Sequence, residues 1–337
     1  MRLARLAVLA TVTLALLAAP PFAEAGEIRR RPQIVGVVYW YIMSAETWLT
    51  LPPVKAFLEG MEKLHWVKDR DFVLDMRPIE HVARMQNGVA SLVARPVDVL
   101  LFLTCDAEFH IARRTTHRIP IVVGPCADDL VGKGVVASLA QPGGNITGIS
   151  LLIPELSARR LSLLKEVVPS LSRVTVLWNP DQRDFALDWQ ELRAAASAMA
   201  VILHALEVRA PVPTVESALA HVITREGADG LLGFPDRLHY QFPKQMAALA
   251  ARAHRPGIYA HREVAEAGGL MSYGPNILRL YRRVATHVAK ILSGTNPSDL
   301  PIEQPTKFEF IINLKTAKAL GLTIPSAVLA RADEVIQ

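Results

Sequence analysis

Aromatic side chains close the first apolar run of the chain, where Tyr39, Trp40 and Tyr41 stand in succession. Aromatic rings offer large, rigid contact surfaces, and Tyr and Trp keep a polar atom for hydrogen bonding. Side chains alternate in direction along a strand, so three in a row cannot all face one core. We therefore expect this segment to contact a ligand; the alternative is a buried strand end covered by a loop.

A polar segment of Thr104, Cys105 and Asp106 follows a second apolar run, at the start of a predicted helix. Thr and Asp are ordinary helix caps. Free N–H groups at a helix start can also receive an anionic ligand group. Asp106 opposes an anion there and favours a cationic or hydroxylated group, and both interpretations stay open.

Two adjacent acids, Asp128 and Asp129, follow the next predicted strand. Neighbouring like charges repel unless water or a cation compensates them. We expect one of them to cap a helix beginning near Leu130 and the other to face a ligand amine.

The two cysteines, Cys105 and Cys126, fall just beyond consecutive predicted strands. A disulfide requires Cα atoms roughly 4.4–6.8 Å apart, which neighbouring strands would allow. An oxidising compartment favours the bond. Two small buried thiols are the alternative.

Later strands also end in polar or aromatic residues, several of which are common turn formers. We predict that they face a ligand together with the residues above: Ser150, Asn179, Asp236, Tyr259, Glu263 and Tyr273.

Known catalytic and cofactor motifs are missing from the sequence. It contains no G-x-x-x-x-G-K-[ST], no G-x-S-x-G and no H-E-x-x-H. Residues 132–137 fit a dinucleotide-binding pattern superficially, but they fall inside a predicted helix at 130–140 instead of a strand-to-helix turn. We expect no catalytic residues, no cofactor and no metal.

The elements that carry these residues alternate between strand and helix. Alternation of this kind predicts parallel sheets with helices on both faces, and ligands then sit beyond the carboxyl ends of the strands. Two such series flank residue 150, which predicts two lobes and a cleft. The predicted strands are 34–40, 72–76, 97–103, 119–124, 146–151, 174–178, 201–208, 230–234, 257–259, 270–273 and 307–313.

The first 25 residues have the pattern of a secretory signal peptide: Arg2 and Arg5, an apolar run to Ala19, and small residues before a cleavage point after Ala25. That run is shorter than the ~20 residues that span a bilayer. We expect an exported, periplasmic protein.

Composition and charge limit the function classes further. The chain has 337 residues, 51% hydrophobic and 20% charged, which suits two globular domains and excludes a disordered chain. The net charge of +5 raises nucleic acid as a partner. Several of the positive charges lie in the predicted signal peptide and at Arg29–Arg31, so we expect no nucleic-acid partner.

Several segments resemble the ABC-transporter substrate-binding proteins, in the family whose better-known members take aromatic amino acids. The matching segments are 136–148 (VASLAQPGGNITG), 154–157 (PELS), 176–180 (VLWNP), 266–275 (EAGGLMSYGP), 304–309 (QPTKFE) and 312–322 (INLKTAKALGL).

The resemblance implies a type I periplasmic-binding-protein fold, with two doubly wound parallel-sheet lobes joined by a three-crossover hinge. Lobe 1 would comprise 33–149 and 275–300, and lobe 2 would comprise 150–274 and 301–337. A monomeric protein would close its lobes on a small organic ligand, aromatic or amino-acid-like, and present it to an ABC permease in the inner membrane.

The chain departs from the family at the expected ligand contacts. Relatives often have Gly-Gly-Thr-Pro where this chain has Thr104 to Ala107, small residues in place of Tyr39–Tyr41, and Asn in place of Leu151. These differences predict a pocket that stacks on a ring and meets a donor or cation with its acids. One alternative is a sensory binding protein. Another is an exported α/β hydrolase using Asp106, Asp128 and Asp236.

Overall fold

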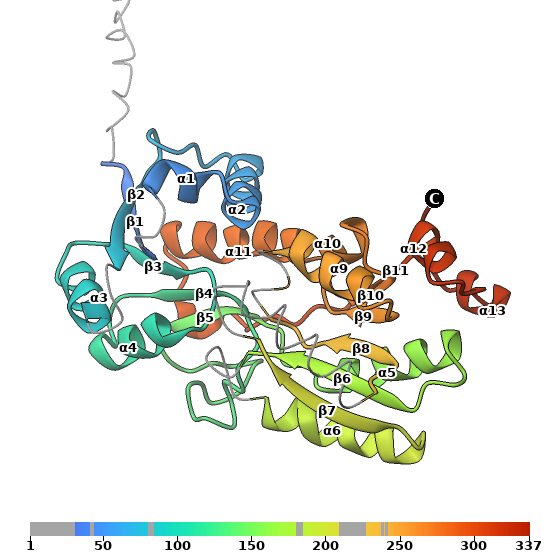
Figure 1. The fold of residues 1–337 in the computed structure, drawn as a ribbon. Coiled ribbons are helices and arrows are strands. Elements are labelled where there is room, and N and C mark those ends of the chain that lie inside the picture. Colours follow the sequence, from blue (N-terminus) through green and yellow to red (C-terminus); the bar gives the residue numbers. More distant parts are fainter. Residues whose placement is uncertain are drawn as a thin grey trace, which may run out of the picture. The chain divides into compact units, whose positions relative to one another are not determined.

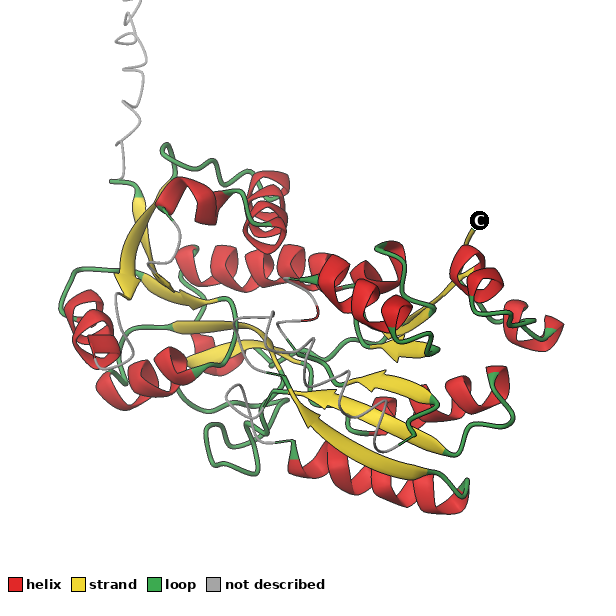
Figure 2. Cartoon of the chain, in the orientation of Figure 1, coloured by secondary structure: helices red, strands yellow, loops and turns green. Residues whose placement is uncertain are grey.

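A computed structural model describes residues 31–40, 44–79, 84–179, 185–208, 227–236, 239 and 242–337. Residues 32–337 form one compact unit. Strands and helices alternate along most of this unit, in two series that build two separate sheets (Figure 1; Figure 2). The predicted signal peptide, the side chain of Trp40, Tyr41 and a helix predicted at 215–226 lie outside the described residues.

The first sheet has five parallel strands in the order β2-β1-β3-β4-β5. Strands β3 and β4 are buried along their whole length, which explains their nearly continuous apolar sequences. The strand bounds are β1 (Gln33–Trp40), β2 (Phe72–Ile79), β3 (Val99–Phe102), β4 (Ile121–Cys126) and β5 (Ile146–Ser150).

Helices cover both faces of the first sheet. On one face α2 (Pro52–Lys63) lies beside α11 (Ile277–Leu292), although the two are far apart in sequence (Figure 1). On the other face lie α3 (Met85–Val93) and α4 (Ala107–Thr115). Helix α2 begins with two prolines, which suit this position because the backbone N–H groups of a first helical turn have no partner within the helix and proline has no N–H.

The second sheet has seven strands in the order β12-β11-β10-β9-β8-β6-β7. Its bounds are β6 (Arg173–Trp178), β7 (Ile202–Glu207), β8 (Gly230–Gly233), β9 (Gly257–Tyr259), β10 (Met271–Gly274), β11 (Glu309–Asn313) and β12 (Glu334–Ile336). Helices again pack on both faces. One core includes α5 (Glu155–Val167) and α6 (Ala186–Ala198), and the other includes α9 (Pro243–Arg252) and α10 (Arg262–Glu266).

The chain passes between the two sheets three times: after β5, after β10 and before β11. The third passage explains a difference from the predicted all-parallel arrangement, because β11 runs antiparallel to β10. Strand β10 runs toward the first lobe, whereas β11 leads away from it, so the two must point in opposite directions.

The first and third passages are joined as two short extended segments. The N–H of Ser150 donates to the carbonyl of Glu303 (2.8 Å), and the N–H of Glu303 donates to the carbonyl of Gly148 (3.0 Å). The buried hydroxyl of Thr147 donates to the carbonyl of Leu300 (2.8 Å). These bonds hold the third passage beside β5, at the edge of the first sheet.

The helix predicted at 130–140 is wrong, because this segment is a series of turns. The carboxylate of Asp129 accepts a hydrogen bond from the N–H of Gly132 (2.7 Å), and Gly134 adopts a left-handed φ of 62°. A residue in that conformation ends a helix, and glycine adopts it without strain. The dinucleotide-like pattern at 132–137 therefore lies in a turn.

Several short elements escaped the sequence analysis because their lengths give no periodic signal: α1 (Ala45–Leu49), α10, the 3-10 helix η2 (Pro297–Asp299), α13 (Ser326–Leu329) and β12. The sequence also predicts a short helix at 314–320, and α12 (Leu314–Ala319) matches it closely. Within the described residues, no helix combines the length and apolarity that crossing a membrane requires.

The close approach of α2 and α11 yields a stability test at Gly60. A Cβ atom there would lie 2.7 Å from the Cβ of Ala285 and 2.7 Å from the carbonyl oxygen of Arg282. Overpacking of this kind costs roughly 1–3 kcal/mol, so we expect Gly60→Ala to lower the free energy of unfolding in urea.

Gly88 in α3 is the matched control, since the nearest atom to its added Cβ would be 3.8 Å away. Gly88→Ala should raise stability by roughly 0.5–1 kcal/mol through helix propensity. Equal effects at the two positions would contradict the close-packing explanation.

Candidate functional site

A cavity of about 970 Å³ lies between the two lobes, at the carboxyl ends of their strands. The segments that follow β1, β3, β4, β8 and β9 reach it, as does the first turn of α11. Parallel strands bring such segments to one edge, which is where ligands bind in sheets of this kind.

Aromatic side chains dominate the lobe 1 side. We call Tyr39, Trp48, Phe102 and Tyr281 the aromatic wall. The rings of Tyr39 and Trp48 lie 6.3 Å apart at an angle of 47°. The hydroxyl of Tyr281 donates to the carbonyl of Leu103 (2.9 Å), which fixes α11 against the end of β3.

Charged side chains dominate the lobe 2 side. We call Asp236, His261, Arg262, Glu263 and Glu266 the charged wall. Asp236 follows β8, and the other four belong to the N-cap and body of α10, directly after β9. The aromatic wall and the charged wall thus belong to different lobes, and lobe 1 also contributes the charged side chains of Asp106, Glu108 and Arg282 to the lining.

Arg262 is held by three carboxylates. Its Nε donates to Glu266 (2.7 Å), and its terminal nitrogens donate to Glu309 (2.6 Å) and Glu334 (2.6 Å). Burial alone would lower the pKa of Arg262, but its hydrogen bonds to Glu266 and Glu309 and their charges raise the pKa above its usual value, so the guanidinium stays charged. The network joins α10 to β11 and β12, so Arg262 holds these three elements of lobe 2 together.

Burial changes the protonation of two residues in the charged wall. Burial raises the pKa of Glu263, whose Oε2 has no hydrogen-bond partner among the described residues. Burial, with the nearby charges of His239 and Arg160, lowers the pKa of His261 to about 3. His261 is therefore neutral at ordinary pH and adds no positive charge to the cavity.

A second cation, Arg160, is buried within lobe 2 and does not line the cavity. Its Nε donates to the carbonyl of Tyr273 (2.8 Å), and a terminal nitrogen donates to Ser157 (3.4 Å). The hydroxyl of Ser157 donates in turn to the buried Asp188 (3.1 Å). These contacts hold the start of α5 against β10 and α6.

The rim at the end of β3 contains the predicted residues Thr104, Cys105 and Asp106, and all three line the cavity. The hydroxyl of Thr104 donates to the carboxylate of Asp106 (2.8 Å). Cys105 and Cys126 are joined by a disulfide, with their Cα atoms 5.1 Å apart. The bond links the carboxyl ends of neighbouring strands β3 and β4 beside the cavity.

Six of the predicted ligand contacts meet at the cavity: Tyr39, Thr104, Cys105, Asp106, Asp236 and Glu263. Trp40 extends β1 by its backbone, but its side chain and the whole of Tyr41 lie outside the described residues.

The adjacent acids Asp128 and Asp129 do not line the cavity. Asp128 is 3% exposed and binds His110 (2.8 Å) and Lys133 (3.2 Å). Burial raises the pKa of Asp128, but the bonds from His110 and Lys133 hold it below its usual value. Asp129 caps the turn at Gly132 and not a helix.

Four other predicted contacts also lie away from the cavity lining: Ser150, Asn179, Tyr259 and Tyr273. Ser150 belongs to the hinge. Tyr259 is fully buried in the lobe 2 core, where an added Cβ on Gly257 would lie 2.7 Å from its hydroxyl. Tyr273 packs between Phe308 and Phe310. Their assignment to ligand contact stays a prediction.

Sequence reasoning missed much of the cavity lining. The missed side chains include Trp48, Phe102, Glu108, Phe242, His261, Arg262, Glu266, Tyr281 and Arg282. Trp48 belongs to a helix of five residues, and Tyr281 reaches the cavity only because α11 returns to lobe 1. No local sequence pattern therefore marks Trp48 or Tyr281 as cavity-lining residues. The position of α10 directly after β9, in contrast, could have identified His261 and Arg262.

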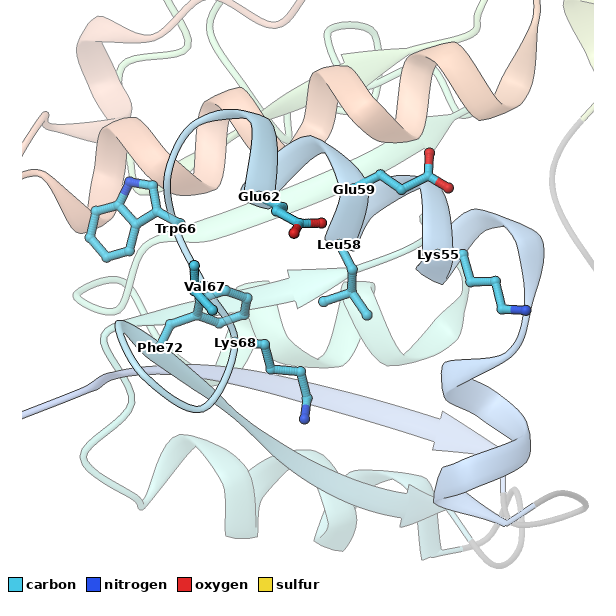
Figure 3. Close-up of a pocket in the computed structure, with 8 residues that line it drawn as sticks. All are labelled: Lys55, Leu58, Glu59, Glu62, Trp66, Val67, Lys68 and Phe72. Atoms are coloured by element: carbon cyan, nitrogen blue, oxygen red, sulfur yellow. The ribbon is translucent and has the colours of Figure 1, made fainter.

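A smaller cavity of about 380 Å³ lies on the outside of lobe 1, between α2 and the start of β2 (Figure 3). Its lining combines acids and lysines with Leu58, Trp66, Val67 and Phe72. It contains none of the predicted ligand contacts. Within the described residues, no group of three or more His, Cys, Asp or Glu side chains could hold a metal ion.

Removing the disulfide should destabilise the protein without changing its fold. The bond spans 21 residues, and closing a loop of that length stabilises by about 3 kcal/mol in the chain-entropy model. We expect the Cys105→Ser/Cys126→Ser variant to lose stability of that order in urea unfolding. A reductant should lower the stability of the wild type to a similar level and leave the variant unchanged. An unchanged wild type would contradict a stabilising bond.

The buried His239 should make stability fall in mild acid. Its pKa is lowered to about 4 by burial, and one ring nitrogen bonds to the carbonyl of Phe234 (2.8 Å). Between the ordinary His pKa of about 6.5 and this lowered value, His239 is protonated in the unfolded chain and neutral in the folded protein. Stability therefore decreases as the pH falls through this range. The loss amounts to about 2 kcal/mol between pH ~7.5 and pH ~5.

His239→Asn keeps a donor for the Phe234 carbonyl and should flatten this part of the pH profile of unfolding. The exposed His65, in a left-handed conformation that Asn tolerates, provides the control His65→Asn. Parallel profiles for wild type and His239→Asn would contradict the proposed cause.

The model of the family described as ABC transporter substrate binding protein matches residues 79–336 of the chain. A tyrosine-binding protein of Clostridioides difficile (strain R20291) is 22% identical over 275 residues, covering 81% of this chain and 77% of that protein.

Solved structures with the same fold include a conserved domain protein from Vibrio cholerae O1 biovar El Tor. It has a TM-score of 0.76 and 24% identity, and the match covers 91% of this chain and all of that one. Another is the ABC domain in complex with L-Trp from Streptococcus pneumoniae, with a TM-score of 0.76, 21% identity, and 90% and 100% coverage.

These structures confirm the predicted type I periplasmic-binding-protein fold. Because the family model covers more than half of the sequence, the chain belongs to the ABC transporter substrate-binding protein family.

Proposed function

We propose that this chain is the periplasmic solute-binding protein of an ABC importer, and that it closes its two lobes on a small organic ligand. The cavity between the aromatic and charged walls carries this proposal. It is lined by strand ends of both lobes, so a ligand held in it can contact both lobes at once and favour their closed arrangement.

In this proposal lobe 1 comprises 33–149 and 275–300, and lobe 2 comprises 150–274 and 301–337. The three passages between these parts form the hinge. Backbone bonds join them, such as the one from the Ser150 N–H to the Glu303 carbonyl and the one from the Glu303 N–H to the Gly148 carbonyl, and the two hydrophobic cores lie on either side, so rotation about the passages leaves both cores intact. The closed monomer would then deliver its ligand to a permease in the inner membrane.

A hydrolytic function has less support in the geometry. Of the three carboxylates that such an enzyme was expected to use, Asp106 and Asp236 line the cavity. Asp128 is committed to His110 and Lys133, away from the cavity lining. One relative is a tyrosine-binding protein, and the ABC domain from Streptococcus pneumoniae was solved in complex with L-Trp.

Ligand binding should be visible as thermal stabilisation together with compaction. A ligand at a hundredfold excess over its Kd stabilises the native state by about 2.7 kcal/mol. We would screen ring-bearing amines, amino acids and carboxylic acids by thermal shift. For each hit we would measure the radius of gyration by small-angle X-ray scattering, and we expect it to fall on binding.

Ala127→Trp should abolish this response, because Ala127 lines the cavity and a large ring would fill it. Ala251→Trp, at an exposed position late in α9, is the matched control and should respond as wild type does. Chemical turnover of a hit, or a hit that binds Ala127→Trp unchanged, would contradict the proposal.

A further inference from the structure

We infer that Asn276 and Glu309 are positioning residues that set the angle between the two lobes. Their side chains are hydrogen-bonded where the second passage leaves lobe 2 and the third passage enters it. This inference rests on the proposed binding function, because lobe closure is part of that proposal. It adds a specific polar contact that controls the closure.

Asn276 joins the second passage to lobe 1. It is the N-cap residue of α11, and its Oδ1 accepts a hydrogen bond from the N–H of Arg279 (3.0 Å). Pro275 alone separates it from Gly274, the last residue of β10. Because α11 packs on α2 in the core of lobe 1, the orientation of this amide is tied to the orientation of that lobe.

Glu309 belongs to lobe 2. It is the first residue of β11, directly after the third passage, and it lies opposite Gly274 in the antiparallel pair of β10 and β11. Its Oε2 accepts a hydrogen bond from Arg262 (2.6 Å), which also donates to Glu266 and Glu334. The carboxylate is therefore fixed to α10 and β12 and moves with lobe 2.

The contact between the two side chains joins the lobes. The Nδ2 of Asn276 donates to the Oε1 (3.1 Å) and Oε2 (3.3 Å) atoms of Glu309. Hydrogen bonds to a charged acceptor are stronger than those between neutral groups. Rotation of lobe 1 about the second passage would break this bond or the cap of α11, since the same amide makes both. The bond therefore favours one interlobe angle.

A second acid limits the part of the third passage that can bend. Glu303 is held on lobe 1 by Arg283, which donates to both of its carboxylate oxygens (2.6 and 2.7 Å). Glu309 is held on lobe 2. Residues 304–308 between these acids belong to no helix or strand, and Gln304, Thr306 and Lys307 are exposed. Bending of the third passage is thus confined to the segment between two ion pairs.

The same side chains meet the cavity. Arg262 and Asn276 both line it, and Glu309 is bonded to each of them. A polar group of a ligand at this place would contact the side chains that hold the interlobe angle. Binding can then shift the equilibrium between lobe arrangements through them.

The test measures the distance between the lobes in the mature chain without ligand, by double electron–electron resonance. Spin labels are attached at Lys63→Cys, the end of α2, and at Ala251→Cys, late in α9, both exposed positions. The two native cysteines are occupied by their disulfide and take no label.

The first variant, Asn276→Asp, separates the contact from the cap. Aspartate caps a helix as well as asparagine does, but here it replaces the donor to Glu309 with a second carboxylate. We expect the fraction of molecules outside the wild-type distance peak to rise roughly fivefold, because loss of a hydrogen bond to a charged group shifts a two-state equilibrium by at least that factor.

Glu309→Gln should have a similar effect. If its amide oxygen keeps Arg262, its amide nitrogen places a donor opposite the donor of Asn276. The double variant Asn276→Asp/Glu309→Gln exchanges donor and acceptor, so it should restore the wild-type distances. Loss of stability alone would not produce this restoration.

The matched control is Asn296→Asp, which makes the same chemical change at the N-cap of η2. Its side chain accepts a hydrogen bond from the N–H of Ser298 (3.3 Å), and the residue is exposed. We expect wild-type distances in this variant.

Wild-type distances in both single variants would overturn the positioning role, and so would a double variant that stays as broad as they are. The binding function is judged separately, by the thermal-shift screen with Ala127→Trp. Hits in that screen, together with distances that do not respond to Asn276→Asp, overturn the positioning role alone. A screen without hits counts against the binding function, and distances that respond would still establish the contact between the lobes.

Discussion

The backbone pairing of the first and third passages between the lobes is the contact on which the rest of the architecture depends. The bonds between Ser150 and Glu303, and between Glu303 and Gly148, hold two extended segments together at one end of both sheets. They keep the carboxyl ends of the two sets of strands facing each other. This constraint brings the cavity-lining residues of the two lobes around one common space.

Within this frame the two lobes contribute different chemistry. Lobe 1 presents rings held by packing and by the bond from Tyr281 to Leu103, so its surface is preformed. Lobe 2 presents carboxylates, which are organised around Arg262. In the proposed closure, a rigid apolar surface and a charged one would enclose a molecule that itself has an apolar part and a polar or charged part. The fold alone would not impose that combination.

The alternation of strands and helices, and the position of polar residues at strand ends, could be predicted from the sequence because both are local patterns. Thr104, Cys105 and Asp106 were found in this way. The direction of a side chain at a strand end is a different matter. Tyr259 follows the same pattern but turns into the lobe 2 core, where glycines leave room for its ring.

Features that depend on long-range contacts could not be predicted. Tyr281 and Arg282 reach the cavity because α11 returns to pack on α2, which no local pattern encodes. The segment 130–140 shows the opposite failure. Its apolar residues have helical spacing, but Asp129 and the left-handed Gly134 favour a turn.

The three carboxylates around Arg262 make the last strand of the chain a remote determinant of the cavity. Glu334 lies in β12, far from any ligand contact in sequence, yet it holds one of the terminal nitrogens of a guanidinium that faces the cavity. A substitution at Glu334 would leave the cavity-lining residues unchanged and remove one of the three carboxylates that hold Arg262, so that only Glu266 and Glu309 would remain. A substitution in β12 can therefore change how a cavity-lining guanidinium is held, and a tag fused next to β12 would lie close to the same ion pair.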